Sequence, residues 1–289
     1  MAFGSGKYQF EVVPGWGRLP DGWEWGWICG VACDSQDRVY VFSRSAHPMV
    51  VFDRDGRFIA SWGEELFGPE NAHGIYIDKQ DRIWTTEWLS HCVRCFTTDG
   101  ELLLTIGTPG TPGAADGDPF NRPTDAAPAS NGDLYISDGY VNARVHHYSP
   151  DGRLLNSWGS HGSGPGEFDL SHCVRIDRRD RVWVCDRENR RIQVFDLSGN
   201  YLFEWSGLKQ PDTIHFDPVE DVLYMAELEQ QVSVRSLDGE VLAAWGGGEK
   251  SEEPGLFAAC PHGIWTDSQG SLYVSEVQAN GRLQKFVRL

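Results

Sequence analysis

The stretch "HCVRIDRRDRVWVCDRENRRIQVFDLSGNYLFEWS", residues 172–206, decides the fold. It contains four short runs that are rich in β-branched and aromatic residues, and polar turns with Asp, Asn and Gly separate these runs. Such runs are typical of β-strands, and "DLSG" at 196–199 has the composition of a hairpin turn. The stretch therefore predicts a four-stranded antiparallel sheet.

The same pattern returns along the whole chain. Its first strand is expected at six places, which are 30–34, 73–78, 124–129, 172–177, 212–217 and 262–267. Five fourth strands are expected, and they end at Trp62, Ile106, Trp158, Trp205 and Trp245. A supersecondary unit that repeats at a steady period is the sequence signature of a repeat architecture.

The sixth repeat lacks its fourth strand, because the chain ends at Leu289 after the third. The N-terminal segment "YQFEVVPGWG", residues 8–17, has the sequence of the missing strand. We expect this segment to complete the last sheet and close a ring. The sequence thus predicts an all-β, six-bladed β-propeller in one domain, 1–289. A linear β-solenoid or a sandwich would leave the N-terminal strand unexplained.

Charge and cysteine content narrow the function classes. The 25 Lys and Arg residues against 42 Asp and Glu residues give a net charge of -17, which opposes nucleic acid and anionic membranes as partners. We expect a small-molecule substrate instead. No basic region followed by an apolar stretch is seen at the N-terminus, and the 7 cysteines suit reduced thiols, so a cytoplasmic location is predicted.

Two long loops, 18–28 and 108–122, run from a fourth strand to the next first strand. The first holds Trp23, Trp25 and Trp27. Both should lie at the channel mouth, as a substrate rim or lid. Tryptophan packing between blades is the alternative.

The repeat register singles out histidines. The position five residues before the end of each first strand holds Cys29, His73, Thr124, His172, Asp212 and His262. Histidine fills alternate repeats only, and alternate blades of a six-bladed ring stand about 120° apart. Three converging imidazoles suit a divalent metal with one open position, Zn2+ first and Fe2+ second. The alternative is three channel histidines that hydrogen bond to water.

A second register lies at the ends of the second strands, on the same face. It holds Arg44 and Arg187, and in the third repeat Tyr140 follows one residue later. Arginine suits a substrate carboxylate, and a tyrosine beside a metal and arginines can act as a general base. An ion pair with Asp186 or Glu188 is the alternative for Arg187, and plain packing is the alternative for Tyr140.

The hexapeptide "LSHCVR" occurs at 89–94 and again at 170–175, in different registers. His172 lies in the histidine register, whereas His91 falls in the loop between the second and third strands of its repeat. His91 is therefore either a substrate contact at the rim, together with Trp88, or a solvated loop histidine.

The chain resembles a known family in three segments, "RPTDAAPASNGDLYISDGYVNARVHHYSPDGRLLNSWG" (122–159), "GPGEFDLSHCVRID" (164–177) and "DRENRRIQVFD" (186–196). They resemble the peptidyl-α-hydroxyglycine α-amidating lyases, which are NHL-type six-bladed propellers. The resemblance spans nearly the whole chain. It implies a catalytic zinc and the cleavage of a carbinolamide, N–CH(OH)–COO⁻, into an amide and glyoxylate. It implies zinc ligands and catalytic residues at His73, His172, His262, Tyr140, Arg44 and Arg187.

The chain also departs from this family. The family's structural calcium uses carbonyls that match Val31 and Ile75 and an aspartate where this chain has Gly263, which argues against calcium. Cys260 replaces a methionine that lines the family site. The four positions of the family's disulfides carry no cysteine and agree with a reduced compartment; they are Asn121, Val141, Trp183 and Val194.

Three functions follow as hypotheses. The first is a metal-dependent lyase for an α-hydroxyglycine-type carbinolamide or a related small hydroxylated amide, with a substrate that bears a carboxylate. The second is a zinc-dependent propeller hydrolase of the lactonase kind, although lactonases usually centre on calcium with Asp, Glu and Asn ligands. The third is a non-catalytic NHL scaffold, which gives no reason for three histidines in register.

Overall fold

The computed structural model describes residues 1–114, 120–278 and 281–289. The regular elements in these ranges are β-strands, arranged in six antiparallel sheets. The described residues contain no helix of the length and apolarity needed to cross a membrane. The chain divides into two compact units, Asn71–Pro211 and the combination of Met1–Glu70 with Asp212–Leu289.

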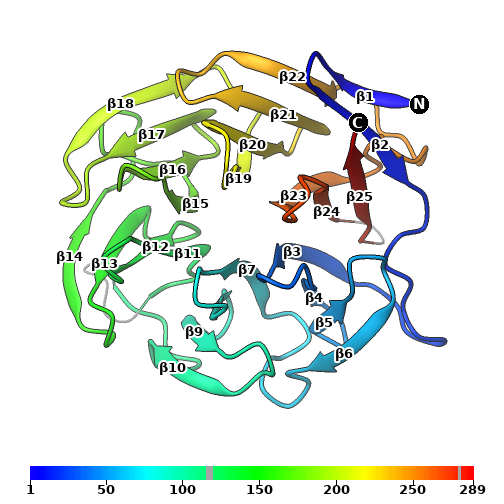
Figure 1. Ribbon diagram of the computed structural model, residues 1–289. Coiled ribbons are helices and arrows are strands. Elements are labelled where there is room, and N and C mark those ends of the chain that lie inside the picture. The colour runs from blue at the N-terminus through cyan, green and yellow to red at the C-terminus, as the bar shows by residue number, and fades with distance from the viewer. Residues whose placement is uncertain (115–119, 279–280) are drawn as a thin grey trace. The chain divides into compact units, whose positions relative to one another are not determined.

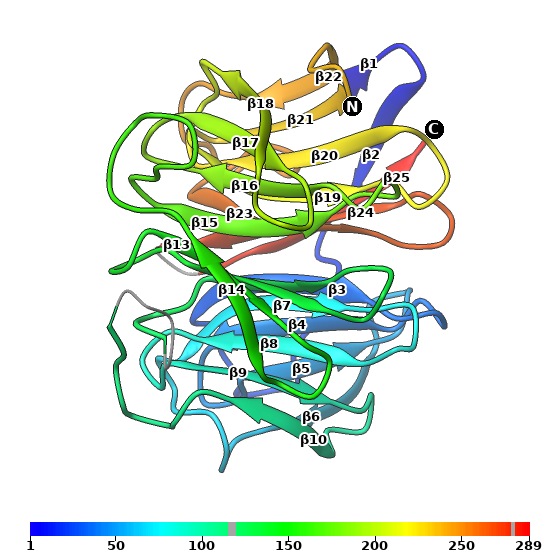
Figure 2. The ribbon, with the colours of Figure 1, turned by 90° about the vertical axis from the view of Figure 1, so that its left-hand side faces the viewer.

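The unit Asn71–Pro211 contains three four-stranded sheets whose strands are neighbours in chain order (Figure 1). The first sheet consists of β7 (Ala72–Ile77), β8 (Ile83–Glu87), β9 (Cys92–Phe96) and β10 (Leu102–Ile106). The second consists of β11 (Asp125–Pro128), β12 (Leu134–Asp138), β13 (Arg144–Tyr148) and β14 (Leu154–Trp158). The third consists of β15 (Ser171–Ile176), β16 (Val182–Asp186), β17 (Arg191–Phe195) and β18 (Tyr201–Ser206), and Figure 2 shows its strands side by side in order.

The other unit also contains three sheets. One consists of β3 (Trp27–Cys33), β4 (Val39–Arg44), β5 (Met49–Phe52) and β6 (Phe58–Trp62). Another consists of β19 (Pro211–Phe216), β20 (Val222–Glu227), β21 (Gln231–Ser236) and β22 (Val241–Gly246). The last joins both ends of the chain in the order β1 (Ala2–Ser5), β2 (Tyr8–Val13), β25 (Leu283–Arg288), β24 (Leu272–Val277) and β23 (Cys260–Thr266).

The sequence-based prediction of an all-β, six-bladed β-propeller is confirmed. Within each unit first strands of successive sheets are neighbours, as β11 lies beside β7 and β15, and β23 lies beside β3; β23 also contacts β20, the second strand of an adjacent sheet. These strands are almost entirely buried, whereas the fourth strands carry exposed residues. The positions of the predicted first strands agree with the structure to within a few residues.

The N-terminal segment closes the last sheet, as predicted. Strand β2 pairs antiparallel with β25, with Val12 opposite Phe286, and the two strands lie side by side in Figure 1. The strand ends at Val13 rather than at Trp16, whose ring packs instead against Phe52 and Tyr273. A fifth strand, β1, pairs with β2 and was not predicted, because "AFGS" is too short and too glycine-rich to indicate a strand.

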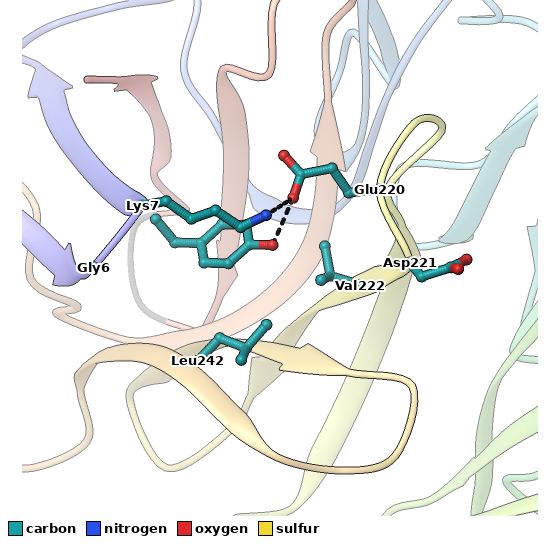
Figure 3. A pocket seen from close by; sticks show the side chains of 7 residues that line it. Gly6, Lys7, Glu220, Asp221, Val222 and Leu242 are labelled. Carbon is teal, nitrogen blue, oxygen red and sulfur yellow. Dashed lines mark hydrogen bonds and ion pairs between the residues drawn. The ribbon is translucent and has the colours of Figure 1, made fainter.

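One carboxylate ties the N-terminal hairpin to the turn between β19 and β20. Glu220 Oε2 accepts hydrogen bonds from Lys7 Nζ at 2.6 Å and Tyr8 Oη at 2.7 Å, and Figure 3 shows the Lys7 side chain pointing at Glu220. Arg288 Nη2 from β25 donates to Glu220 Oε1 at 2.9 Å. The hydrogen bonds from Lys7 and Tyr8, together with that from Arg288, lower the pKa of Glu220 to about 2. The contact thus joins both termini to a neighbouring sheet.

The aspartates that end the first strands have a structural role. Asp177 Oδ1 accepts hydrogen bonds from the backbone N–H groups of Arg179 and Arg181, and its Oδ2 accepts from Arg181 Nε at 2.7 Å and Trp183 Nε1 at 3.0 Å. Related contacts to a buried carboxylate recur at Asp34, Asp78, Asp217 and Asp267. Each contact fixes the hairpin between a first and a second strand, which explains why the repeats carry this residue.

Candidate metal centre

The three histidines in register lie at irregularities of their strands. The pairing of each first strand with its second strand shifts register across the histidine, between Ala72 and Ile75, between Ser171 and Cys173, and between Pro261 and Ile264. A β-bulge of this kind turns a side chain away from the regular alternation and is frequent next to functional sites. All three histidines are buried.

In the unit Asn71–Pro211, His73 is held by two hydrogen bonds. Its Nδ1 lies 2.6 Å from the carbonyl oxygen of Thr124, which can only accept, so Nδ1 carries the proton. Its Nε2 therefore accepts a hydrogen bond from Tyr140 Oη, at 3.0 Å. The backbone carbonyl thus fixes the tautomer that directs the Nε2 lone pair towards Tyr140.

Gly74 allows this arrangement. A Cβ atom at this position would lie 2.6 Å from the Thr124 carbonyl oxygen and 2.8 Å from Thr86 Oγ1. A side chain there would push β7 away from the start of β11, and His73 would lose its contact with Thr124. The residue after the histidine is therefore glycine for a packing reason.

His172, His73 and Tyr140 form one cluster of rings in this unit. The ring centroids of the two histidines lie 4.9 Å apart. The Tyr140 ring centroid lies 5.2 Å from that of His73 and 5.9 Å from that of His172, edge to face in both cases. The sequence placed these three residues at one site, and within this unit they do meet.

Trp88 lies beside this cluster, and Trp88 and His91 both contact Arg122. The Trp88 ring lies 5.5 Å from that of Tyr140, and the Arg122 guanidinium lies 5.0 Å from the Trp88 centroid. His91 accepts a hydrogen bond at Nδ1 from the backbone N–H of Arg122, at 3.0 Å, and burial together with Arg122 lowers the pKa of its ring. His91 therefore holds the end of the 108–122 loop, whose residues 115–119 lie outside the described residues. Substrate contact by either residue stays a prediction.

Arg187 lies just after β16 and forms an ion pair. Its Nε donates to Glu188 Oε1 at 2.9 Å, and its side chain is 13% exposed. Asp186, the other acid considered from the sequence, accepts from Arg191 Nε at 2.7 Å. The ion pair between Arg187 and Glu188, which the sequence offered as the structural alternative, is therefore present. A role of Arg187 in substrate binding stays a prediction.

The second unit holds His262 in a matching arrangement. His262 Nδ1 lies 2.5 Å from the carbonyl oxygen of Cys29, so that this imidazole also presents Nε2 as its unprotonated nitrogen. A Cβ atom at Gly263 would lie 2.8 Å from Gly30 Cα and 2.9 Å from Val31 N. The backbone of β3 fills the space that an aspartate side chain would need, so this position has no room for the carboxylate that binds calcium in the family that the sequence resembles. The carbonyls of Val31 and Ile75 belong to paired strands, β3 and β7.

Asp212 is the residue near His262 that sequence reasoning missed. Its Oδ2 lies 3.5 Å from His262 Nε2, and its side chain is completely buried. The signal was present, because Asp212 occupies the histidine register in the fifth repeat. Only the structure shows that adjacent members of the register touch.

Arg44 lies near Cys29 and beside Trp27. The Arg44 guanidinium lies 5.1 Å from the ring centroid of Trp27, which is 42% exposed. Burial raises the pKa of the Cys29 thiol to about 12, and the nearby Arg44 opposes this rise. Cys260 is buried beside Cys29. None of the seven cysteines forms a disulfide and all are buried, and the raised pKa of Cys29 is the opposite of the lowered pKa of a reactive thiol.

The tryptophans of the 18–28 loop separate into two kinds. Trp23 stacks on His47 with ring centroids 3.3 Å apart, and Trp25 contacts Phe52. Trp27 is exposed beside Arg44. Packing explains the positions of Trp23 and Trp25. Of the three tryptophans, Trp27 remains the candidate for the substrate rim.

The donor set fits a metal ion. His73, His172 and His262 are buried imidazoles that could hold a metal. In His73 and His262 a backbone carbonyl binds Nδ1 and leaves Nε2 as the ligand nitrogen. Such second contacts orient most metal-binding histidines and strengthen them as ligands.

Known proteins share this sequence and fold. The family model described as "NHL repeat" matches residues 171–195. NHL repeat-containing protein 3 of Homo sapiens is 31% identical over 98% of this chain and 85% of its own length. Peptidyl-alpha-hydroxyglycine alpha-amidating lyase 1 of Drosophila melanogaster is 33% identical over 51% of this chain and 29% of its own length. A solved gluconolactonase from Xanthomonas campestris has a TM-score of 0.69 at 16% identity, covers 99% of this chain and 97% of that chain, and shows the fold alone.

These matches carry different weight. The similarity to the amidating lyase spans about half of this chain, so it supports a relationship and not an activity. The similarity to NHL repeat-containing protein 3 spans almost the whole chain, and the matched repeat includes the β15–β17 region from which the fold was predicted. The chain belongs to the family of NHL repeat-containing proteins.

Proposed function

We propose that the protein is a metal-dependent lyase that cleaves an α-hydroxyglycine-type carbinolamide into an amide and glyoxylate. The observation that carries the proposal is the hydrogen bond of 3.0 Å between Tyr140 Oη and His73 Nε2. At this distance, an atom bound at His73 Nε2 would lie within reach of the Tyr140 phenol oxygen. The similarity to an amidating lyase over half of the chain supports the same reaction.

In this proposal, His73, His172 and His262 together hold one divalent metal, with zinc as the first candidate and iron as the second. Three neutral imidazoles with one position left open are a donor set that both metals accept. When bound, the metal would supply a Lewis acid that polarises the substrate hydroxyl. The fixed Nδ1 protons of His73 and His262 support this assignment, since the ligand nitrogens need no rearrangement.

With His73 Nε2 engaged in metal binding, Tyr140 would act as the phenolate, and its Oη would take the hydroxyl proton of the substrate and then deliver it to the leaving nitrogen. The C–O bond then becomes a carbonyl, the electron pair of the C–N bond moves to nitrogen, and nitrogen takes up a proton. The products are an amide and glyoxylate, with all atoms accounted for. Edge-to-face contacts with His73 and His172 and the contact with Trp88 hold the phenol ring for this transfer.

The substrate carboxylate would need a local cation, because the chain as a whole carries a net charge of -17. Arg44 is the stronger candidate of the two arginines, since its guanidinium lies beside the exposed Trp27. Arg187 is engaged with Glu188 and would have to share its charge. A bidentate contact between guanidinium and carboxylate would orient the reacting carbon.

The test is the release of glyoxylate from α-hydroxyhippurate by the zinc-loaded protein, with the chelated protein as the control. We expect glyoxylate and benzamide in equal amounts, at a rate that depends on metal. A second arm uses gluconolactone. Hydrolysis of the lactone without glyoxylate release would replace the lyase by the hydrolase, and turnover of neither compound by a metal-loaded protein would overturn the proposed reaction.

A further inference from the structure

The feature behind this inference is a chain of hydrogen bonds through the hydroxyl of Thr86, within the unit Asn71–Pro211. Thr86 lies in β8 and is buried. Its Oγ1 accepts a hydrogen bond from the backbone N–H of Gly74 at 2.7 Å and donates one to the carbonyl oxygen of Thr124 at 2.8 Å. The same carbonyl accepts the Nδ1 proton of His73. The hydroxyl therefore joins the strand that carries His73 to the carbonyl that orients its ring.

The groups themselves fix the direction of each hydrogen bond in this chain. A backbone N–H can only donate and a carbonyl oxygen can only accept, so the single proton of the Thr86 hydroxyl points at Thr124. The Thr124 carbonyl thus accepts from two donors, the Thr86 hydroxyl and the His73 ring. The bond from Gly74 polarises the hydroxyl, which strengthens the bond from Thr86 to Thr124.

The hydroxyl acts on His73 from two sides. Through the Gly74 N–H it holds the peptide group that follows His73, and this peptide group lies in the register irregularity of β7, where regular strand pairing is interrupted. Through the Thr124 carbonyl it holds the acceptor that keeps the His73 proton on Nδ1 and leaves Nε2 as the ligand nitrogen. A residue without the hydroxyl would remove the acceptor of the Gly74 N–H, and the peptide group would have to turn.

The other unit repeats this arrangement around His262. The backbone N–H of Gly263, the residue after this histidine, donates to Ser275 Oγ at 2.9 Å. Ser275 stands in the same register of its second strand as Thr86, one residue before a glutamate. His262 Nδ1 likewise binds a backbone carbonyl, that of Cys29. The recurrence of a hydroxyl behind two of the three histidines indicates a role in orienting them.

We propose that Thr86 is a positioning residue of the metal site that the proposed function assigns to His73, on which this inference rests. It acts through His73 and needs no contact with the metal or the substrate. It fixes the tautomer and the direction of the imidazole, so that Nε2 is presented as a ligand before any ion arrives. Removal of a partner that lies one layer behind a metal-binding histidine lowers metal affinity by about 10- to 100-fold.

The zinc affinity, measured by competition with a chromophoric chelator, tests the inference with Thr86→Val as the central variant. Valine keeps the β-branched frame of threonine and replaces the hydroxyl by a methyl group. We expect the zinc affinity of Thr86→Val to fall by about 10- to 100-fold, and that of Thr86→Ser, which keeps the hydroxyl, to stay close to the wild-type value. Thr85→Val is the matched control, because it makes the same change at the adjacent buried residue, whose Oγ1 has no hydrogen-bond partner among the described residues.

The ¹⁵N NMR shifts of the imidazole ring provide a second readout, and in the wild type they do not depend on the folding of a variant. In the metal-free wild type, His73 should have a protonated Nδ1 and an unprotonated Nε2. In Thr86→Val the two tautomers should become mixed, whereas Thr86→Ser and Thr85→Val should keep the wild-type shifts. A wild-type zinc affinity in Thr86→Val, an equal loss of affinity in Thr85→Val, or a wild-type His73 ring protonated at Nε2 would each overturn the inference.

His73→Ala separates this inference from the proposed metal site. If His73→Ala loses zinc and Thr86→Val binds zinc like the wild type, the metal site stands and only the role of Thr86 is wrong. If His73→Ala binds zinc with wild-type affinity, the metal site itself is wrong, and the inference about Thr86 fails with it.

Discussion

In His73 and His262, the hydrogen bond at Nδ1 determines which role the Nε2 atom can take. The carbonyls of Thr124 and Cys29 bind Nδ1 of His73 and His262 and leave the opposite nitrogen as the acceptor. Tyr140 uses this acceptor in one unit, and Asp212 faces it in the other. Single backbone groups on neighbouring strands thus determine the chemistry of both side chains.

Replacement of Tyr140 by Phe tests the role of the phenol oxygen. The variant keeps the ring that packs against His73, His172 and Trp88, and it loses the proton acceptor. We expect the rate of glyoxylate release to fall by about 10²- to 10⁴-fold, the usual contribution of a general base, with the metal content unchanged. Wild-type turnover by Tyr140→Phe would remove this residue from the mechanism.

Strands β7, β15 and β23 each have a register irregularity at their histidine, and this irregularity helps to form the site. A strand without an irregularity would continue the regular alternation of side chains between the two faces of the sheet. At each irregularity the residue in register leaves that alternation. The close approach of β7 to the start of β11, which Gly74 permits, then provides the carbonyl of Thr124.

Gly74→Ala tests this close approach. The new Cβ would lie 2.6 Å from the Thr124 carbonyl oxygen, so β7 and β11 must separate. We expect a loss of about 1–3 kcal/mol in the free energy of unfolding, measured with denaturant, and weaker metal binding because His73 loses its partner. Gly68→Ala is the matched control, since a Cβ there meets nothing within 4 Å. Equal stability of the two variants would show that the close approach is not required.

The sequence was enough to predict the strands and their order, because each repeat has the same alternation and the same turn residues. It could not predict the strand irregularities, the carbonyl contacts of the histidines or the contact of Asp212, since these depend on the distance between adjacent blades. The short strand β1 was missed for a local reason. Its four residues pair with β2 only because that strand offers a free edge.

At the scale of the whole molecule, both ends of the chain meet in one sheet, and Glu220 connects that sheet to its neighbour. The pKa of Glu220 is lowered to about 2 in the folded protein, below the usual value of 4.5 in an unfolded chain. Folding therefore favours the ionised form. The stabilisation is fully present above about pH 4.5 and is lost as the pH falls towards 2.

Glu220→Gln should remove this pH dependence. Above pH 5 the wild type should be more stable than the variant by about 1–2 kcal/mol, less than the pKa shift implies because the Glu220 side chain is 27% exposed. The difference in unfolding free energy should shrink steadily between pH 4.5 and the acid limit of stability. A difference that stays constant over this range would mean that the ion pairs contribute no pH-dependent stability.

The central claim is that three histidines from alternate repeats make one metal centre. The most direct test is the metal content of the purified protein, measured by mass spectrometry for the wild type and for His172→Ala. We predict one divalent metal per chain in the wild type, its loss in His172→Ala, and its retention in the control His161→Ala, which changes an exposed histidine that contacts the Val141 carbonyl. Full metal occupancy in His172→Ala would contradict the account.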